Sequence, residues 1–255
     1  MSGRVASSAV TLALLTACSS AGSLHEIAIE TPLQPKLDVS SFSRILIAGF
    51  IAGGSDEVDA NRETARLLRS QLRNQSDLRV VEADVMALAD MALRKEVGEG
   101  FGDAVPLAEP NTITEEQELE EYERVFADIG FWQELGTSYQ QPLIVTGTVL
   151  FTPHARAGFV TQEQESYDSF GRRRVVPVRA YRERTGYVLS QKFIFIDGRT
   201  GATLYTESHR EEILYEADQN TPALSSYFEL MDRLIPTFLG ALSTETIRGT
   251  RILLR

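Results

Sequence analysis

The sequence predicts an α/β domain with a mixed central sheet flanked by helices, in a three-layer-like arrangement that follows an N-terminal signal and a flexible tether. Two continuous apolar runs of strand length, 44–50 and 143–149, are typical of strands buried on both faces of a sheet. Segments with helical periodicity lie between these runs. Two β-rich runs joined by a tight turn, 187–197 and 202–215, follow the second one.

The composition narrows the class of protein. The chain has 255 residues, which suits one domain of moderate size or two small ones. Its 25 basic and 36 acidic residues argue against nucleic acid as a partner, because phosphate binding needs a positive surface. No stretch after the N-terminal region approaches the length of a transmembrane helix.

The first residues have the layout of a secretory signal. Arg4 is followed by a short apolar run, 9–15, and then by Leu15, Thr16, Ala17 and Cys18. This pattern resembles the lipobox of bacterial lipoproteins, in which a diacylglyceryl group is attached to the cysteine sulfur and cleavage leaves that cysteine at the new N-terminus. The resemblance implies a signal peptide over 1–17 and lipid attachment, including palmitate, at Cys18.

Cys18 is the only cysteine, so no internal disulfide competes for its thiol. The alternative is an unstructured start with an incidental cysteine. Ser19, where an aspartate would act as a retention signal, implies the outer membrane with the protein facing the periplasm. Pro32 and Pro35 interrupt a Ser-, Ala- and Gly-containing stretch, so we expect a tether over 18–41 and a periplasmic domain over 42–255.

The first half of the domain alternates strands and helices. A helix is predicted over 61–75, with Asp59 as its N-cap and with Ala65, Leu68 and Leu72 on its apolar side. A short strand over 78–82 and a helix over 84–95 follow, and 98–110 reads as a loop. The glutamates between Glu115 and Glu123 then predict the start of a single acidic helix that runs to Pro142, because carboxylates stabilise the positive end of a helix dipole.

The second half contains an insert without a clear period. Residues at about 152–186 are unusually basic, and we expect irregular structure over 152–184. Thr221 and Pro222 predict the start of a helix that Pro236 should kink or split. Residues 251–254 predict a last strand that closes the sheet.

Three stretches together resemble a known family. The segments "ILIAGF", "LIVTGTV" and "FIFIDGRTG" look like the α/β domain of the curli-export (curli production assembly) lipoproteins. Lipoproteins that activate peptidoglycan synthases and the N-terminal domain of the Tol-system β-propeller protein share that fold more loosely. The resemblance covers most of 45–242, implies a scaffold or secretion role without catalysis, and supplies no catalytic residues.

The glycines after the first strand, Gly49, Gly53 and Gly54, allow two interpretations. One is a loop that cradles phosphate, and the other is a plain turn. No P-loop lysine follows, and the acidic residues at 56, 57 and 59 would repel phosphate, which favours the turn.

A second candidate site is the alternating set Glu207, His209 and Glu211, which one face of a strand would present together. Such side chains bind zinc or similar ions, but a solvated strand face explains them more simply, so we expect no metal and no cofactor. His154 has no evident carboxylate partner, and Cys18 is committed to lipid, so nucleophilic catalysis has no candidate. We therefore expect no enzyme. A metal-dependent hydrolase using Glu207 and His209 is the weakest alternative.

The insert carries the candidate contact surface. Its basic residues oppose the acidic run 115–123, so it is either a solvated loop or a contact site for anionic headgroups or for the acidic helix of a neighbouring copy. The latter would build a homo-oligomer. The residues are Arg172, Arg173, Arg174, Arg179, Arg182 and Arg184.

Val176, Val178 and Ala180 alternate within this insert, but arginines interrupt them. A membrane-spanning strand needs about 9–11 residues with an apolar outer face, and this band is shorter. We therefore expect an outer-membrane lipoprotein whose periplasmic domain binds envelope proteins of an assembly or export system. The alternative is a subunit of an oligomeric secretion channel that uses part of 152–184 as membrane hairpins.

Overall fold

The computed structural model describes residues 24–96, 113–216, 219, 221–243 and 245–254. The described residues fall into a larger unit within 34–245 and a smaller unit that joins residues up to 33 with residues from 246 onward. No helix in these described ranges is long and apolar enough to cross a membrane.

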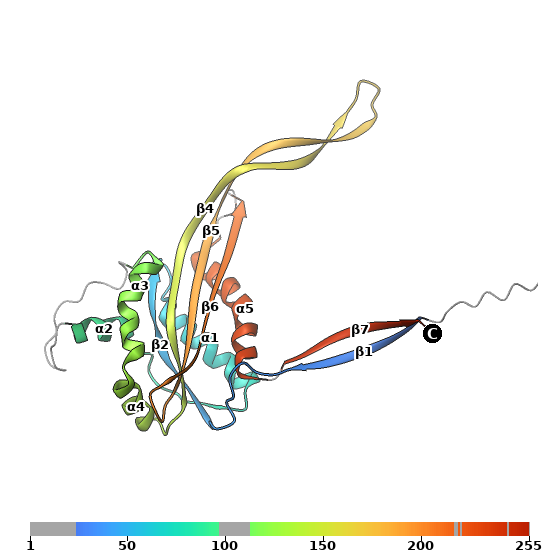
Figure 1. Ribbon diagram of the computed structural model, residues 1–255. Coiled ribbons are helices and arrows are strands. Elements are labelled where there is room, and N and C mark those ends of the chain that lie inside the picture. Colours follow the sequence, from blue (N-terminus) through green and yellow to red (C-terminus); the bar gives the residue numbers. More distant parts are fainter. Residues whose placement is uncertain (1–23, 97–112, 217–218, 220, 244, 255) are drawn as a thin grey trace, which may run out of the picture. The chain divides into compact units, whose positions relative to one another are not determined.

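The larger unit is built on a five-stranded mixed sheet, which confirms the predicted fold class. The strand order is β3-β2-β4-β5-β6, with β2 parallel to β3 and β4 and the other neighbours antiparallel (Figure 1). The two apolar runs form β2 and β4 and pair from Ile45 with Leu143 onward. The strands are β2 (Arg44–Gly54), β3 (Arg79–Val80), β4 (Leu143–Tyr167), β5 (Arg173–Asp197) and β6 (Thr203–Glu216).

Helices cover both faces of this sheet, so the chain has the expected three layers. One face packs on α1 (Ala60–Gln75) and α5 (Ala223–Leu242), and the core between them includes Phe193 and Phe238. The other face packs around the fully buried Trp132. It is covered by α2 (Leu88–Glu96), α3 (Glu116–Tyr122), the 3-10 helix η2 (Glu123–Ala127) and α4 (Ile129–Ser138).

Helix α1 follows its prediction closely. The side chain of Asp59 accepts a hydrogen bond from the backbone N–H of Arg62, at 3.0 Å, and so caps the helix. Ala65, Leu68 and Leu72 are buried against the sheet. The amphipathic pattern and the cap therefore specify this helix locally.

The single acidic helix was a wrong prediction. The segment divides into α3, η2 and α4, because two N-terminal caps occur within it. Glu115 and Glu118 form a capping box at α3, and the Asp128 side chain accepts from the N–H of Phe131 to start α4. The indole of Trp132 donates to the carbonyl of Val125, at 2.9 Å, and ties η2 to α4.

Helix α5 begins directly after Pro222, as predicted, but Pro236 does not split it. Pro236 lies on the exposed side of the helix, while Leu230, Leu234 and Phe238 are buried on the other side. Because one proline removes only one backbone hydrogen bond, the packing of the buried side outweighs that loss.

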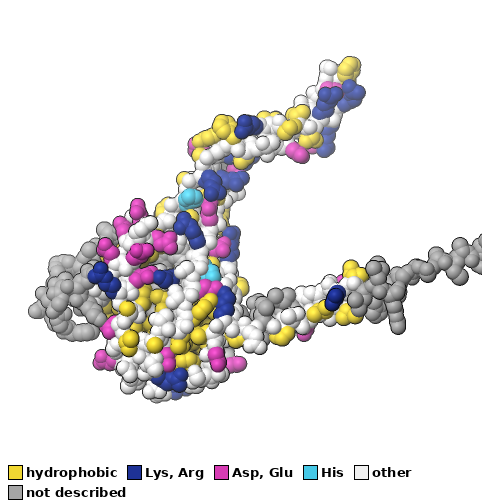
Figure 2. Space-filling view, viewed as in Figure 1, with side chains coloured by type: hydrophobic (Ala, Val, Ile, Leu, Met, Phe, Trp, Pro, Cys, Tyr) yellow, Lys and Arg dark blue, Asp and Glu magenta, His cyan; other side chains and the backbone are white. Residues whose placement is uncertain are grey.

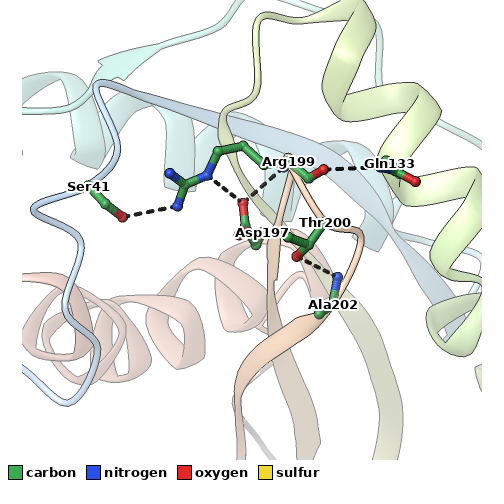
Figure 3. Close-up of polar contacts among 6 residues, drawn as sticks. All are labelled: Ser41, Gln133, Asp197, Arg199, Thr200 and Ala202. Atoms are coloured by element: carbon green, nitrogen blue, oxygen red, sulfur yellow. Dashed lines mark hydrogen bonds and ion pairs between the residues drawn. The ribbon is translucent and has the colours of Figure 1, made fainter.

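The turn between β5 and β6 is confirmed and holds three parts of the larger unit together (Figure 3). The Asp197 carboxylate accepts from the backbone N–H and from Nε of Arg199, at 2.9 and 3.2 Å. The Arg199 guanidinium donates to the Ser41 hydroxyl, at 3.3 Å. The backbone carbonyl of Arg199 accepts from the Gln133 side chain of α4, also at 3.3 Å. The guanidinium also lies over the ring of Phe42, 5.0 Å from its centroid.

The chain ends differ from their predictions. Within the expected tether, β1 (Leu24–Leu33) is a strand, and it pairs with β7 (Glu245–Leu254) in a two-stranded sheet of its own. The last strand therefore does not close the central sheet. Arg248 and Glu30 form an ion pair across this small sheet, at 3.0 Å, which the local sequence of either strand does not reveal.

The segment 34–41 is also more ordered than a tether. Leu37 is buried, and its backbone N–H donates to the carbonyl of Ala241 at the end of α5, at 3.0 Å. The domain therefore begins near residue 34 instead of 42. The physical reason is that Leu37 and Phe42 complete the core on the α5 face of the sheet.

Candidate protein-binding surface

The insert that was predicted to be irregular is instead a regular antiparallel pair of strands. Strands β4 and β5 pair without interruption from Leu143 with Asp197 to Tyr167 with Arg173. Strand β2 pairs with β4 only up to Phe151 of β4. Strand β6 pairs with β5 only from Arg184 of β5 onward. Residues 157–183 therefore form a two-stranded extension of the sheet, called the ribbon from here on (Figure 1).

The ribbon exists because its polar residues form cross-strand pairs that the sequence alone does not display. Both arms contain residues that favour strands, such as Val160 and Thr161 on one arm and Val176 and Tyr181 on the other, and both also contain charged residues. Arg173 lies 2.9 Å from Glu165 and belongs to the arm opposite it. Opposite charges on neighbouring positions stabilise the pairing, so a composition that suggested a loop belongs to a strand.

The end of the ribbon is a turn organised by Asp168. One carboxylate oxygen accepts from the backbone N–H groups of Phe170 and Arg172, at 2.9 and 3.0 Å. The other accepts from Nε of Arg172, at 2.9 Å. The hydrogen bond from the Arg172 backbone, followed by the one from Phe170, keeps the pKa of Asp168 below its ordinary value. Gly171 has a φ of 75°, which completes the turn without steric cost.

The structure brings the predicted arginines onto this ribbon but pairs most of them with carboxylates. Arg174 lies 3.8 Å from Asp168, so Arg172 and Arg174 share one carboxylate. At the other end of the ribbon, Arg182 and Arg184 share Glu216 of β6, at 2.9 and 3.3 Å. The hydrogen bond from Arg182 lowers the pKa of Glu216. The surface is thus less positive than the sequence suggested.

Arg179 differs, because its guanidinium lies over the ring of Phe159, 5.8 Å from the centroid. Phe159 faces Tyr181 on the opposite arm, with ring centroids 5.4 Å apart. Phe159 is 68% exposed and Tyr181 57% exposed. These three side chains form an aromatic and cationic group that we call the shaft patch.

Sequence reasoning missed the aromatic residues of this surface. Tyr167 and Phe170 at the end of the ribbon are 68% and 81% exposed. Figure 2 shows hydrophobic side chains at the surface of this end, close to Lys or Arg side chains. The signal that could have revealed them is the run Tyr167-Asp168-Ser169-Phe170-Gly171, a turn between two alternating β-rich segments. Val176, Val178 and Ala180 occupy the face opposite to the shaft patch, as their alternation predicted.

The acidic run is placed in α3 and η2, where its members also have local partners. The Glu118 carboxylate accepts backbone hydrogen bonds from Thr114 and Glu115, and these lower its pKa. Glu123 binds Nζ of Lys192 at 2.7 Å, and Glu116 lies 3.8 Å from Arg210. The opposed charge blocks therefore do not pair with each other within the described residues.

The candidate metal site does not assemble in the described part of the chain, where no group of three suitable side chains could hold an ion. Glu207 forms a hydrogen-bonded ion pair with Lys36, and this hydrogen bond is the main reason why the pKa of Lys36 is raised. Nε2 of His209 lies 3.5 Å from Glu207. The interpretation as a solvated strand face is also incomplete, since the side chains of Glu207 and His209 are only 14% and 18% exposed.

Two other expectations need correction. Gly49, Gly53 and Gly54 do not form a turn after β2 but belong to the strand itself, with a β-bulge at Gly49, where φ is 139°. His154 does have a carboxylate neighbour, because its Nε2 lies 3.7 Å from Glu212 on β6. The pairing of β4 with β5, and of β5 with β6, brings these two residues together.

The lipid-attachment residue Cys18 and the cleavage-motif residues Leu15, Thr16 and Ala17 lie outside the described residues. Their roles therefore remain predictions from the sequence. The same holds for the signal peptide over 1–17.

Comparison with known proteins identifies no family. No family model matches the chain, and no curated protein matches it. Among solved structures, a lipoprotein from Neisseria meningitidis is similar at 13% identity with a TM-score of 0.34, covering 77% of this chain and 97% of that one. A PDZ domain protein from Parabacteroides distasonis is similar at 9% identity with a TM-score of 0.24, covering 90% of this chain and 39% of that one. TM-scores this low establish no common fold.

Proposed function

We propose that this chain is a lipid-anchored envelope protein without enzymatic activity, and that it binds partner proteins through the shaft patch of its ribbon. The observation that carries the proposal is the exposure of Phe159 and Tyr181 beside Arg179 on a ribbon that no described helix of the larger unit covers. Aromatic residues and arginine dominate the binding energy of protein interfaces. A two-stranded ribbon is also marginally stable by itself in water, so a bound partner would stabilise it.

The anchor part of the proposal comes from the sequence. Acylation of Cys18 after removal of 1–17 would hold the protein on a membrane, and Ser19 favours the outer membrane with the domain in the periplasm. Two or three acyl chains, each contributing about 0.8 kcal/mol per methylene, suffice for stable attachment. The envelope proteins bound there would belong to an assembly or export system.

Site-specific photo-crosslinking tests the binding site. A photoreactive phenylalanine analogue at Phe159 or Tyr181 should give one defined crosslinked partner in intact cells. The matched control is Ile129 on α4, which is 57% exposed and lies against Gly201 of the β5–β6 turn, at the end of β5 opposite to the ribbon, and should give no such product. Equal labelling from all three positions, or none from the ribbon, would remove the proposal.

Metabolic labelling tests the anchor separately. The wild-type protein should incorporate radioactive palmitate, and Cys18→Ser should abolish the label and leave an uncleaved chain. A wild-type protein with a free thiol would contradict the anchor while leaving the ribbon's role open to the crosslinking test.

The ribbon also favours a second candidate function, a subunit of an oligomeric outer-membrane secretion channel. Its two arms belong to strands of 25 residues each, in a segment for which the sequence predicted irregular structure. If the chain is such a subunit, we expect crosslinks from Phe159 to another copy of the same chain, heat-modifiable gel mobility and single-channel currents. A partner of different mass and no conductance would favour the first function.

A further inference from the structure

The end of the ribbon carries a second surface, distinct from the shaft patch. We call residues 166–176 the ribbon tip. It exposes Tyr167, Phe170, Val175 and Val176, which are 68%, 81%, 49% and 38% exposed. Asp168 holds the backbone around Phe170 through the hydrogen bonds described above, so the exposed ring is presented by an ordered turn.

The charge of the tip differs in sign from that of the chain. Over 166–176 there are three consecutive arginines, of which Arg172 and Arg174 share Asp168. Arg173 pairs with Glu165 directly before the tip, so residues 165–176 together carry a net charge of +1. The whole chain has a net charge of −11. The guanidinium of Arg172 lies 5.4 Å from the centroid of the Phe170 ring, so the exposed ring and the basic group are directly adjacent.

We propose that the ribbon tip inserts Phe170 and Tyr167 into the interfacial region of a bilayer that carries anionic headgroups. Aromatic rings prefer the depth of the headgroups, where arginine side chains can bind phosphate groups at the same time. The tip is a narrow projecting turn, which a bilayer can accept without a preformed complementary pocket. A protein partner would need such a pocket to bury these rings.

This inference is independent of the proposed function, because a vesicle contains no protein partner. It also requires no membrane-spanning segment, since the tip reaches only the surface layer. It adds a second contact to the predicted acyl anchor, because a basic patch contributes electrostatic attraction to anionic lipids beside the buried acyl chains.

Tryptophan quenching by brominated lipid tests the proposal locally. The full chain carrying Cys18→Ser, which removes acylation, receives Phe170→Trp and is mixed with vesicles of brominated phosphatidylcholine, with or without brominated phosphatidylglycerol. Trp132 is the only native tryptophan and is fully buried, so the parent chain supplies an unquenched baseline. We expect at least a two-fold loss of the introduced fluorescence with phosphatidylglycerol, and much less without it.

Two matched variants complete the test. Phe159→Trp places the probe in the shaft patch and should not be quenched. Replacing Arg172, Arg173 and Arg174 by glutamine in the Phe170→Trp background should abolish the dependence on phosphatidylglycerol, with an unchanged far-ultraviolet circular dichroism spectrum. Absence of quenching at position 170, equal quenching at 159 and 170, or equal quenching with both lipid mixtures would each overturn the proposal. So would a self-associated form whose formation depends on Phe170 and which binds no vesicles.

Discussion

Phe159 and Tyr181 face each other across the ribbon with their ring centroids 5.4 Å apart and their ring planes inclined at 68°. Neither ring reaches the two cores of the larger unit, and both remain more than half exposed. An aromatic pair of this kind stabilises a sheet by about 0.5–1.5 kcal/mol. Because the pair is exposed, we expect it to contribute more to the binding of a partner than to the stability of the fold.

Phe159→Ser and Tyr181→Ser should therefore separate binding from stability. We expect each to weaken partner binding about ten-fold, as is typical of interface hot spots. The free energy of unfolding should fall by no more than about 1.5 kcal/mol, which is the upper value for the contribution of the aromatic pair itself. Urea denaturation and quantitative pull-down measure the two effects. A large loss of stability with unchanged binding would assign the pair a structural role.

The turn at Asp168 should respond to acid. Because hydrogen bonds lower the pKa of Asp168 in the folded protein, its contribution to turn stability is complete at neutral pH and is lost as the pH falls through that lowered pKa. The amide NMR signals of Phe170 and Arg172 should shift in this acidic range, below the ordinary carboxyl titration. In Asp168→Asn the same signals should not titrate. A wild-type turn whose signals stay constant down to the lowest accessible pH would contradict the assignment.

Gly136 of α4 lies against the β5–β6 turn so closely that it tolerates no side chain. A β-carbon at this position would lie 1.9 Å from the carbonyl oxygen of Gly198. We expect Gly136→Ala to lower the free energy of unfolding by about 1–3 kcal/mol, as overpacking does. Gly130→Ala in the same helix is the matched control, since its β-carbon would have only one neighbour, at 3.6 Å. It should be neutral or stabilise by up to about 1 kcal/mol. Equal effects in urea denaturation would refute the close contact.

Tyr227 connects α5 to α1 through its buried hydroxyl. It donates to the carbonyl of Ala60, at 3.2 Å, and pairs with the hydroxyl of Thr64. Burial raises the pKa of Tyr227 above its ordinary value, so the hydroxyl is neutral at neutral pH. Tyr227→Phe should cost about 1 kcal/mol of stability, and a double-mutant cycle with Thr64→Val should give a coupling of at least about 0.5 kcal/mol. Additive effects would show that the two hydroxyls act independently.

The sequence alone predicted the elements whose signals are local. The apolar runs at 44–50 and 143–149, the cap at Asp59 and the turn at 197–201 each depend on residues close together in the chain. For the same reason, the motif ending at Cys18 could be recognised without any fold. Five of the six arginines lie on β5 and Arg172 lies in the turn directly before it, and the sequence alone did not reveal this placement.

Tertiary structure decided the features that depend on distant partners. The ribbon requires Glu165 to meet Arg173 and Phe159 to meet Tyr181, and neither contact can be read until the register of β4 and β5 is known. Likewise, β1 becomes a strand only because β7, more than two hundred positions later, supplies its partner. Strand pairing is a nonlocal interaction, whereas a helix cap, a turn and a signal motif are specified within a few residues.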